Sequence, residues 1–206
     1  MPFETNVFIN CPFDKDYVPL LKSLVFTIIY CGFEPQLSIT RSGANIRINE
    51  IKKLIKGSKY SVHDLSRCKP MKIGELPRFN VPYELGLDIG CFEYGGAKLK
   101  RKVILILETE KFHYQKVLSD IAGQDIQDHN DEPKKVIQKV RHWLATNNIH
   151  LSFDGPTEIW NSFNLFNSDL NATLSSNFTK HEIEEMSVVE YMKFTKNWVK
   201  IKKQYG

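Results

Sequence analysis

The sequence predicts an α/β domain with an open, mostly parallel sheet that carries helices on both faces. The first observation is that short apolar runs alternate with segments of helical periodicity over residues 6–107. This alternation favours parallel strands joined by right-handed helical crossovers. The second observation is the unbroken apolar run from Val103 to Leu107. Such a run is typical of a central strand that is buried on both faces.

Each expected element follows from a local pattern. Leucine and isoleucine at helical spacing predict a helix over 17–30, where Pro19 falls in the first turn and Gly32 follows the end. Four apolar runs predict strands, at 6–10, 33–39, 60–65 and 101–107. Two further helices are expected over 46–57 and from Tyr83 onward.

The second half of the chain is expected to be mostly helical. Residues 112–123 have a helical pattern, 124–133 are polar and predict a loop, and 133–147 predict an amphipathic helix. After the break at 154–156, residues 157–206 predict a helical extension whose last helix covers 180–204. We therefore expect an α/β domain over 1–150 and a helical C-terminal extension over 157–206.

Composition excludes several classes of protein. The net charge of +4 in 206 residues is too small to predict nucleic-acid binding. No apolar run reaches the roughly 20 residues of a membrane span, and the N-terminus lacks the pattern of a signal peptide. The four cysteines are scattered without a C-x-x-C pair, so we expect reduced thiols, a cytoplasmic location and neither zinc nor disulfides.

Ligands of open parallel sheets bind beyond the carboxyl ends of the strands, at the switch point of the strand order. Four expected loops meet at that edge, and each supplies polar side chains. The candidates are Asn10, Asp14, Arg41, Ser42, Arg47, His63, Asp64, Ser66, Arg67, Asn80 and Glu84. The sequence has no Walker loop, no G-x-G-x-x-G after the first strand and no G-x-S-x-G elbow.

The stretch 76–90 is the most distinctive of the four. Pro77 and Pro82 suit a loop or a first helical turn, and an apolar helix pattern begins at Tyr83. Glu84 then lies among apolar neighbours near the N-terminus of a helix. Desolvation would raise the pKa of this carboxyl group and the helix dipole would lower it. Glu84 is therefore a candidate for chemistry, with a helix-capping role as the alternative.

Three segments together resemble a known superfamily: Val7-Phe-Ile-Asn10, His63-Asp-Leu-Ser-Arg67, and the stretch 76–86 that contains Glu84-Leu-Gly86. Over about residues 5–110 the chain resembles the nucleoside 2-deoxyribosyltransferases and the TIR domains that cleave NAD, in particular bacterial TIR-like proteins of unassigned or defence-associated role. The resemblance implies a flavodoxin-like fold. It also implies a glutamate that attacks or stabilises the anomeric carbon of a ribose while the base leaves.

Carried over by position, the resemblance makes Glu84 the catalytic residue. It makes Asp64 a residue that holds the sugar or base, and it places Asn10 and Phe13 in the lining of a nucleotide pocket. One departure concerns the loop before Glu84. It carries Arg78-Phe79-Asn80 where the deoxyribosyltransferases usually have a further acidic residue, which speaks against deoxyribosyl transfer.

The remaining candidates have roles that follow from their side chains. Arg41, Arg47 and Arg78 could pair with the phosphates of a ligand. Phe13 or Tyr83 could stack on a base. The binding set is completed by Asp14, Ser66 and Asn80.

Structural roles compete with several of these assignments. Asp64 and Ser66 could serve only as turn and capping residues. Arg41 and Arg47 could be solvated surface charges. His63 should point away from Asp64, because side chains alternate along a strand, and it is expected to be structural. The segment 119–125, with His129, is expected to form either a lid over the crevice or a plain surface turn.

The expected function is cleavage of the N-glycosidic bond of NAD or a related nucleotide, as the resemblance implies. The ADP-ribose product could be released or cyclised as a signal in antiviral defence. NAD is the substrate in this scheme, and no cofactor is expected. The alternatives are base exchange between nucleosides, and a non-catalytic module that only binds a nucleotide. A homo-oligomer or an effector partner is compatible with the sequence, whereas a membrane or nucleic-acid partner is not expected.

Overall fold

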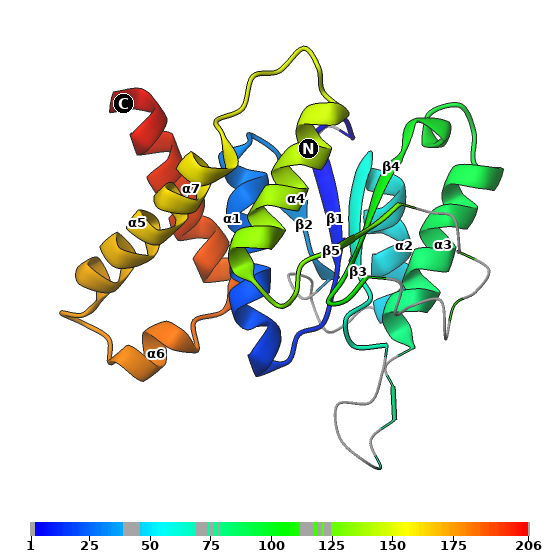
Figure 1. Ribbon diagram of the computed structural model, residues 1–206. Helices are drawn as coiled ribbons and strands as arrows, with labels where there is room; N and C mark the ends of the chain where they lie inside the picture. Colours follow the sequence, from blue (N-terminus) through cyan, green and yellow to red (C-terminus); the bar gives the residue numbers. More distant parts are fainter. Residues whose placement is uncertain are drawn as a thin grey trace.

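A computed structural model describes residues 3–38, 46–68, 74, 76–77, 79–111, 118, 121 and 125–205. Its centre is an open five-stranded sheet of order β2-β1-β3-β4-β5, in which every pair of neighbours is parallel (Figure 1). The strands are β1 (Asn6–Asn10), β2 (Glu34–Gln36), β3 (Tyr60–Asp64), β4 (Val103–Glu108) and β5 (Ile126–Asp128). This strand order is that of the flavodoxin-like folds, so the predicted fold class is confirmed.

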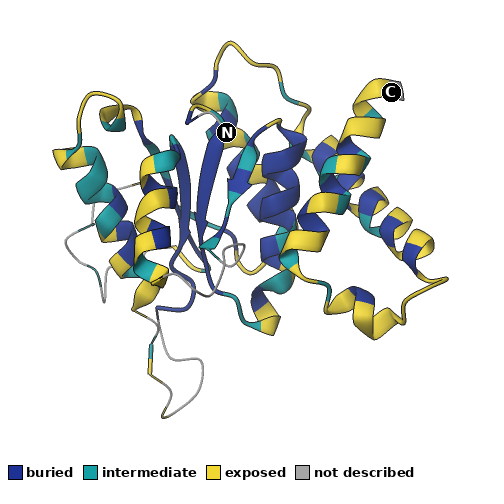
Figure 2. Ribbon diagram, turned by 180° about the vertical axis from the view of Figure 1, so that it is seen from behind, coloured by how far each residue is buried: buried dark blue, intermediate teal, exposed yellow. Residues whose placement is uncertain are grey.

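Helices cover both faces of the sheet, as predicted. The main-domain helices are α1 (Val18–Tyr30), α2 (Arg47–Gly57), α3 (Asn80–Tyr94) and α4 (Pro133–Thr146), with short 3₁₀ turns η1 (Lys15–Tyr17) and η3 (Leu99–Arg101). Alternate residues of β1 face opposite layers: Phe8 packs with α2, whereas Val7 and Ile9 join the core formed with α1 and α4. Both β1 and β3 are buried throughout, as Figure 2 shows.

The C-terminal extension packs on the outer side of α1. It consists of α5 (Pro156–Leu174), α6 (Lys180–Glu184) and α7 (Val188–Tyr205). The ring of Phe26 in α1 lies 5.4 Å from that of Phe163, 5.6 Å from that of Phe166 and 6.1 Å from that of Trp198. These aromatic side chains therefore bury the extension against the sheet domain.

Three predicted boundaries were wrong. The second strand has only three residues, and Pro35 at its centre is tolerated because β2 lies at the edge of the sheet. The last predicted helix is two helices: Ser187 Oγ accepts a hydrogen bond from the backbone N–H of Glu190, and this cap starts α7 anew. The third helix begins at Asn80, three residues earlier than expected.

A fifth strand, β5, lies where a polar loop was predicted. Only Ile126 of this strand is buried, so three residues do not give a strand pattern in the sequence. The predicted helix over 112–123 lies almost entirely outside the described residues.

Candidate functional site

The strand order reverses between β1 and β3, so the carboxyl ends of these two strands mark the switch point. The chain leaves β1 at Asn10 and leaves β3 at Asp64. The N-terminal part of α3 lies beside them, because the amide of Asn10 donates a 3.0 Å hydrogen bond to the carbonyl of Val81. Three of the four predicted loops thus meet at one edge. Most of the fourth, residues 39–45, lies outside the described part of the chain.

Asp64 is fully buried, and both of its oxygens accept hydrogen bonds. Oδ1 accepts from the backbone N–H of Ser66 at 2.9 Å and from the Ser66 hydroxyl. Oδ2 accepts from the Tyr17 hydroxyl at 2.5 Å and from His129 Nε2 at 3.0 Å. Burial raises the pKa of Asp64, but the hydrogen bonds from His129, Ser66 and Tyr17 outweigh it and hold the pKa below its ordinary value. The carboxylate therefore ties three loops together as an anion.

His129 is not among the predicted binding residues, and the sequence assigns it with 119–125 to either a lid or a surface turn. It follows β5 and is fully buried. Its Nδ1 accepts a 3.1 Å hydrogen bond from the backbone N–H of Asp131, so Nε2 carries the proton that is donated to Asp64. Asn130 and Asp131 have positive φ angles of 51° and 56°, a conformation in which Asn and Asp are enriched. This turn directs His129 into the interior.

Asn10 and His63 belong to a second buried network, on the α3 side of the sheet. The Asn10 amide donates to His63 Nδ1 at 2.9 Å, so Nε2 of this histidine carries the proton and donates to Asp88 at 2.9 Å. His63 and Asp88 are completely buried, and Asn10 nearly so. His63 thus points away from Asp64, as strand alternation predicted.

Lys102 completes this network. Its ammonium group lies 3.0 Å from Asp88 Oδ1 and donates to the carbonyls of Ile55 and Ser58 at 2.9 and 2.6 Å. Burial raises the pKa of Asp88, but the bond from His63 and the charge of Lys102 hold it below its ordinary value. The ion pair fixes α3 on the sheet.

Glu84 lies on α3 one turn before Asp88, and it has a different environment. It is 6% exposed, and its carboxyl group has no hydrogen-bond partner among the described residues. Burial raises its pKa from 4.5 to about 7, although the charge of Arg47 opposes the rise. A carboxyl group in this state is poised between its two protonation forms at neutral pH.

The end of β1 lies close to three carboxylates. Burial raises the pKa of the Cys11 thiol well above its ordinary value, and the charges of Asp64, Glu84 and Asp14 raise it further. These three carboxyl groups are therefore within electrostatic range of the Cys11 side chain. Sequence analysis placed all three in the candidate site.

The other predicted residues are distributed around this point. Asp14 accepts from the backbone N–H of Tyr17 at 3.1 Å and lies 3.6 Å from Arg67 Nε. Phe13 is half-buried and packs against the core, whereas Arg47, Asn80 and Tyr83 are exposed at the first turns of α2 and α3. Arg41 and Arg78 lie outside the described residues.

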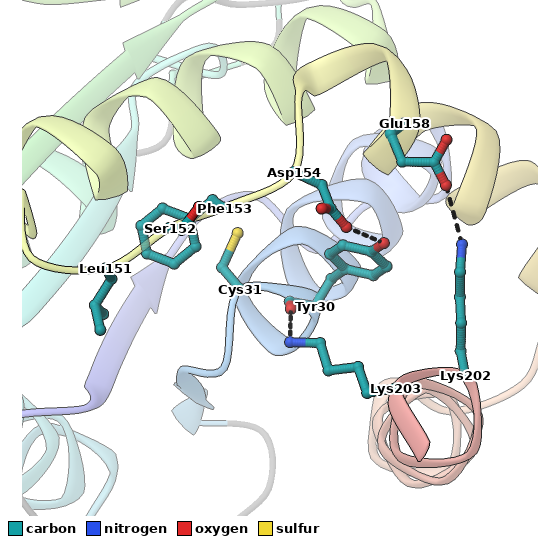
Figure 3. Close-up of a pocket in the computed structure, with 9 residues that line it drawn as sticks. All are labelled: Tyr30, Cys31, Leu151, Ser152, Phe153, Asp154, Glu158, Lys202 and Lys203. Atoms are coloured by element: carbon teal, nitrogen blue, oxygen red, sulfur yellow. Dashed lines mark hydrogen bonds and ion pairs between the residues drawn. The ribbon is translucent and has the colours of Figure 1, made fainter. Parts of the chain in front are cut away.

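A cavity of about 610 Å³ lies at the opposite, amino edge of the sheet (Figure 3). It lies between the end of α1, the segment before α5, and α7. The side chains there satisfy one another: Tyr30 donates to Asp154, Lys203 donates to the Tyr30 carbonyl, and Lys202 pairs with Glu158. This cavity is separate from the carboxyl-edge site.

Two features are absent from the described residues. No cluster of three or more His, Cys, Asp or Glu side chains there is arranged to hold a metal ion. None of the described helices has the length and apolar character needed to cross a bilayer.

The fold and site define an α/β flavodoxin-like protein with a partly desolvated glutamate beside the switch point. Comparisons with protein-family models, with curated proteins and with solved structures gave no match.

Proposed function

We propose that the protein cleaves the N-glycosidic bond of NAD or a related nucleotide, with Glu84 as the nucleophile or charge stabiliser. The observation that carries the proposal is the environment of Glu84: buried at the ligand-binding edge, without a hydrogen-bond partner among the described residues, and with a pKa of about 7. A buried carboxyl group without hydrogen-bond partners is destabilised in its ionised form. The ionised form is therefore stabilised most strongly when a positive charge develops next to it.

Cleavage of the N-glycosidic bond develops a positive charge at the anomeric carbon of the ribose. As the base departs, the ribose acquires oxocarbenium character, which a nearby carboxylate stabilises or traps covalently. Nicotinamide leaves from NAD as a neutral molecule because its ring is cationic in the substrate, so no acid is needed. The same cationic ring would favour the ionised form of Glu84 when substrate is bound.

In this scheme Asp64 and Asn10 hold the elements of the site in position. The two oxygens of Asp64 accept hydrogen bonds from four donors, and the side-chain amide of Asn10 donates both of its hydrogen bonds to protein atoms. Asp64 holds the loops after β1, β3 and β5, and Asn10 holds the start of α3. A ligand would then contact the side chains exposed at the edge, among them Arg47, Asn80 and Tyr83.

The test is to incubate the purified chain with NAD and with a panel of nucleosides, and to resolve the products by mass spectrometry. We expect release of nicotinamide by the wild type and none by Glu84→Gln. Glu93→Gln is the matched control, because Glu93 is an exposed glutamate on the same helix. Undiminished nicotinamide release by Glu84→Gln would refute the proposed role.

The second candidate is base exchange between nucleosides, and the pKa of Glu84 is the observation that favours it. A neutral base must be protonated to leave, and a carboxyl group with a pKa of about 7 is a suitable acid. The two functions predict opposite pH profiles. For NAD cleavage kcat/KM should rise as pH increases through about 7, whereas for base exchange it should fall and product should require a second base.

A further inference from the structure

A second surface of interest lies between α2 and α3, on the side of the molecule away from the C-terminal helices (Figure 1). The two helices enclose a groove of about 510 Å³. Its floor is aliphatic, formed by Ile55, Leu87 and Leu99 together with Gly90 and Cys91. These residues lie in the later turns of both helices, toward the amino edge of the sheet, so the groove is distinct from the site around Glu84.

The rim of the groove is basic. Lys52 and Lys56 are one turn apart on α2, both are exposed, and neither has an acidic partner among the described residues. The neighbouring acidic groups on α3 are engaged elsewhere: Asp88 pairs with Lys102, and Glu93 with Lys100. The two rim lysines are therefore available to an acidic partner.

An aromatic side chain stands at the end of the groove. Tyr94 is 92% exposed at the last residue of α3, and it lines the groove with Gly95. Tyrosine is enriched in protein interfaces because it combines apolar area with a hydroxyl group and loses little conformational entropy. An apolar floor, unpaired lysines and an exposed tyrosine together indicate a protein-binding surface.

We propose that this groove binds an acidic amphipathic helix of another protein. Two neighbouring helices present a groove into which the side-chain ridge of a third helix fits. Apolar side chains of that helix would cover Ile55 and Leu87, while its flanking carboxylates would pair with Lys52 and Lys56. Nucleic acid fits less well, because the floor offers aliphatic groups in place of a stacking platform and no arginine is among the described residues that line the groove. The proposal does not depend on the proposed enzymatic function.

Two pairs of variants test the surface. Gly90→Leu should place an apolar side chain in the groove, since there is open space around a Cβ built at Gly90. Gly86→Leu is its control, as Gly86 lies on the same helix outside the groove and has equal room. Lys52→Glu with Lys56→Glu reverses the rim, and Lys193→Glu with Lys200→Glu makes the same charge change on the exposed surface of α7.

The probe is an unbiased phage-displayed library of peptides about 15 residues long, roughly four helical turns. We expect selection on the wild-type protein to recover acidic peptides with apolar residues at i, i+3 and i+4. Their affinity, measured by fluorescence anisotropy, should fall about tenfold or more in Gly90→Leu and in the rim reversal, and remain unchanged in both controls.

Three results would overturn the proposal. The first is the recovery of no peptides, or of peptides without net negative charge. The second is equal affinity for the wild type and both groove variants. The third is displacement of the selected peptides by a single-stranded DNA oligonucleotide, which would make the surface a nucleic-acid site.

Discussion

Replacing Glu84 with glutamine is expected to stabilise the fold at alkaline pH while abolishing activity. In the folded protein the pKa of Glu84 is raised from 4.5 to about 7, and in the unfolded chain it returns to its ordinary range. Between these values the folded protein holds a proton that the unfolded chain has lost. The stabilising effect of that proton is complete below pH 4.5 and is lost as pH rises through about 7. Glutamine is neutral throughout and has no such loss.

The size of the effect follows from the same interval. From 4.5 to about 7 the free-energy difference is at most ~3 kcal/mol, at about 1.4 kcal/mol for each tenfold change in the proton equilibrium. Glu84 retains some contact with solvent, so we expect about 1–3 kcal/mol above pH 7. For a chain of this size that corresponds to a rise of about 2–12 °C in Tm. At about pH 5 the two proteins should have nearly equal Tm values.

The assay is thermal unfolding of wild type, Glu84→Gln and Glu93→Gln at a series of pH values from about 5 to about 9. The exposed Glu93 side chain serves as the control for loss of one negative charge on α3. The Tm difference between Glu84→Gln and wild type should increase with pH, whereas that of Glu93→Gln should stay nearly flat. A constant difference for Glu84→Gln would show that the carboxyl group is not desolvated, and would refute the proposed chemical role of Glu84.

Three further predictions concern the framework that positions the site. Lys102→Met leaves Asp88 as a buried anion without its cation, so the free energy of unfolding in urea should fall by about 3–5 kcal/mol, and adding Asp88→Asn should restore part of the loss. Tyr17→Phe removes one donor to Asp64 and should cost about 1–3 kcal/mol at neutral pH. Because the pKa of Asp64 is lowered, its stabilising effect is present above 3.8 and lost as pH falls through the lowered value, so this deficit should shrink in strong acid. Phe26→Ala should lower the free energy of unfolding by about 3–5 kcal/mol, because it leaves a cavity between α1 and the C-terminal helices, and thermal unfolding measures the loss.

Each of these predictions has a result that contradicts it. A Lys102→Met protein as stable as the wild type would mean that the Asp88 charge is solvated. A Tyr17→Phe deficit that stays constant down to strongly acidic pH would separate Tyr17 from the ionisation of Asp64. A Phe26→Ala protein with the stability of the wild type would mean that the aromatic contact between α1 and the C-terminal helices does not stabilise the fold.

The sequence was sufficient for the parallel sheet because each long strand carries its own signal. The run from Val103 to Leu107 is apolar since β4 lies inside the sheet, and the alternation at His63 and Asp64 correctly assigned these side chains to opposite faces. The three-residue strand β5 has no such signal. It holds its place through pairing with β4, and backbone pairing leaves little trace in residue types.

His129 was missed as a binding partner of Asp64 for the same reason. Without β5, the polar residues around it have the composition of a surface turn. Its burial depends on the pairing of β5 and on the left-handed backbone at Asn130 and Asp131, which carry its imidazole to a carboxylate 65 residues earlier in the chain. Long-range hydrogen bonds of this kind are set by tertiary structure, and local sequence patterns do not contain them.

Asp64 and Glu84 lie at the same edge of the sheet, but their pKa values are shifted in opposite directions. Both are buried, so desolvation raises the pKa of each. Asp64 gains four hydrogen bonds and stays ionised, whereas among the described residues only the charge of Arg47 opposes the desolvation of Glu84. Environments that separate two carboxyl pKa values assign different roles to them. An ionised Asp64 fixes the loops of the site, and this leaves Glu84 as the group whose charge can respond to a ligand.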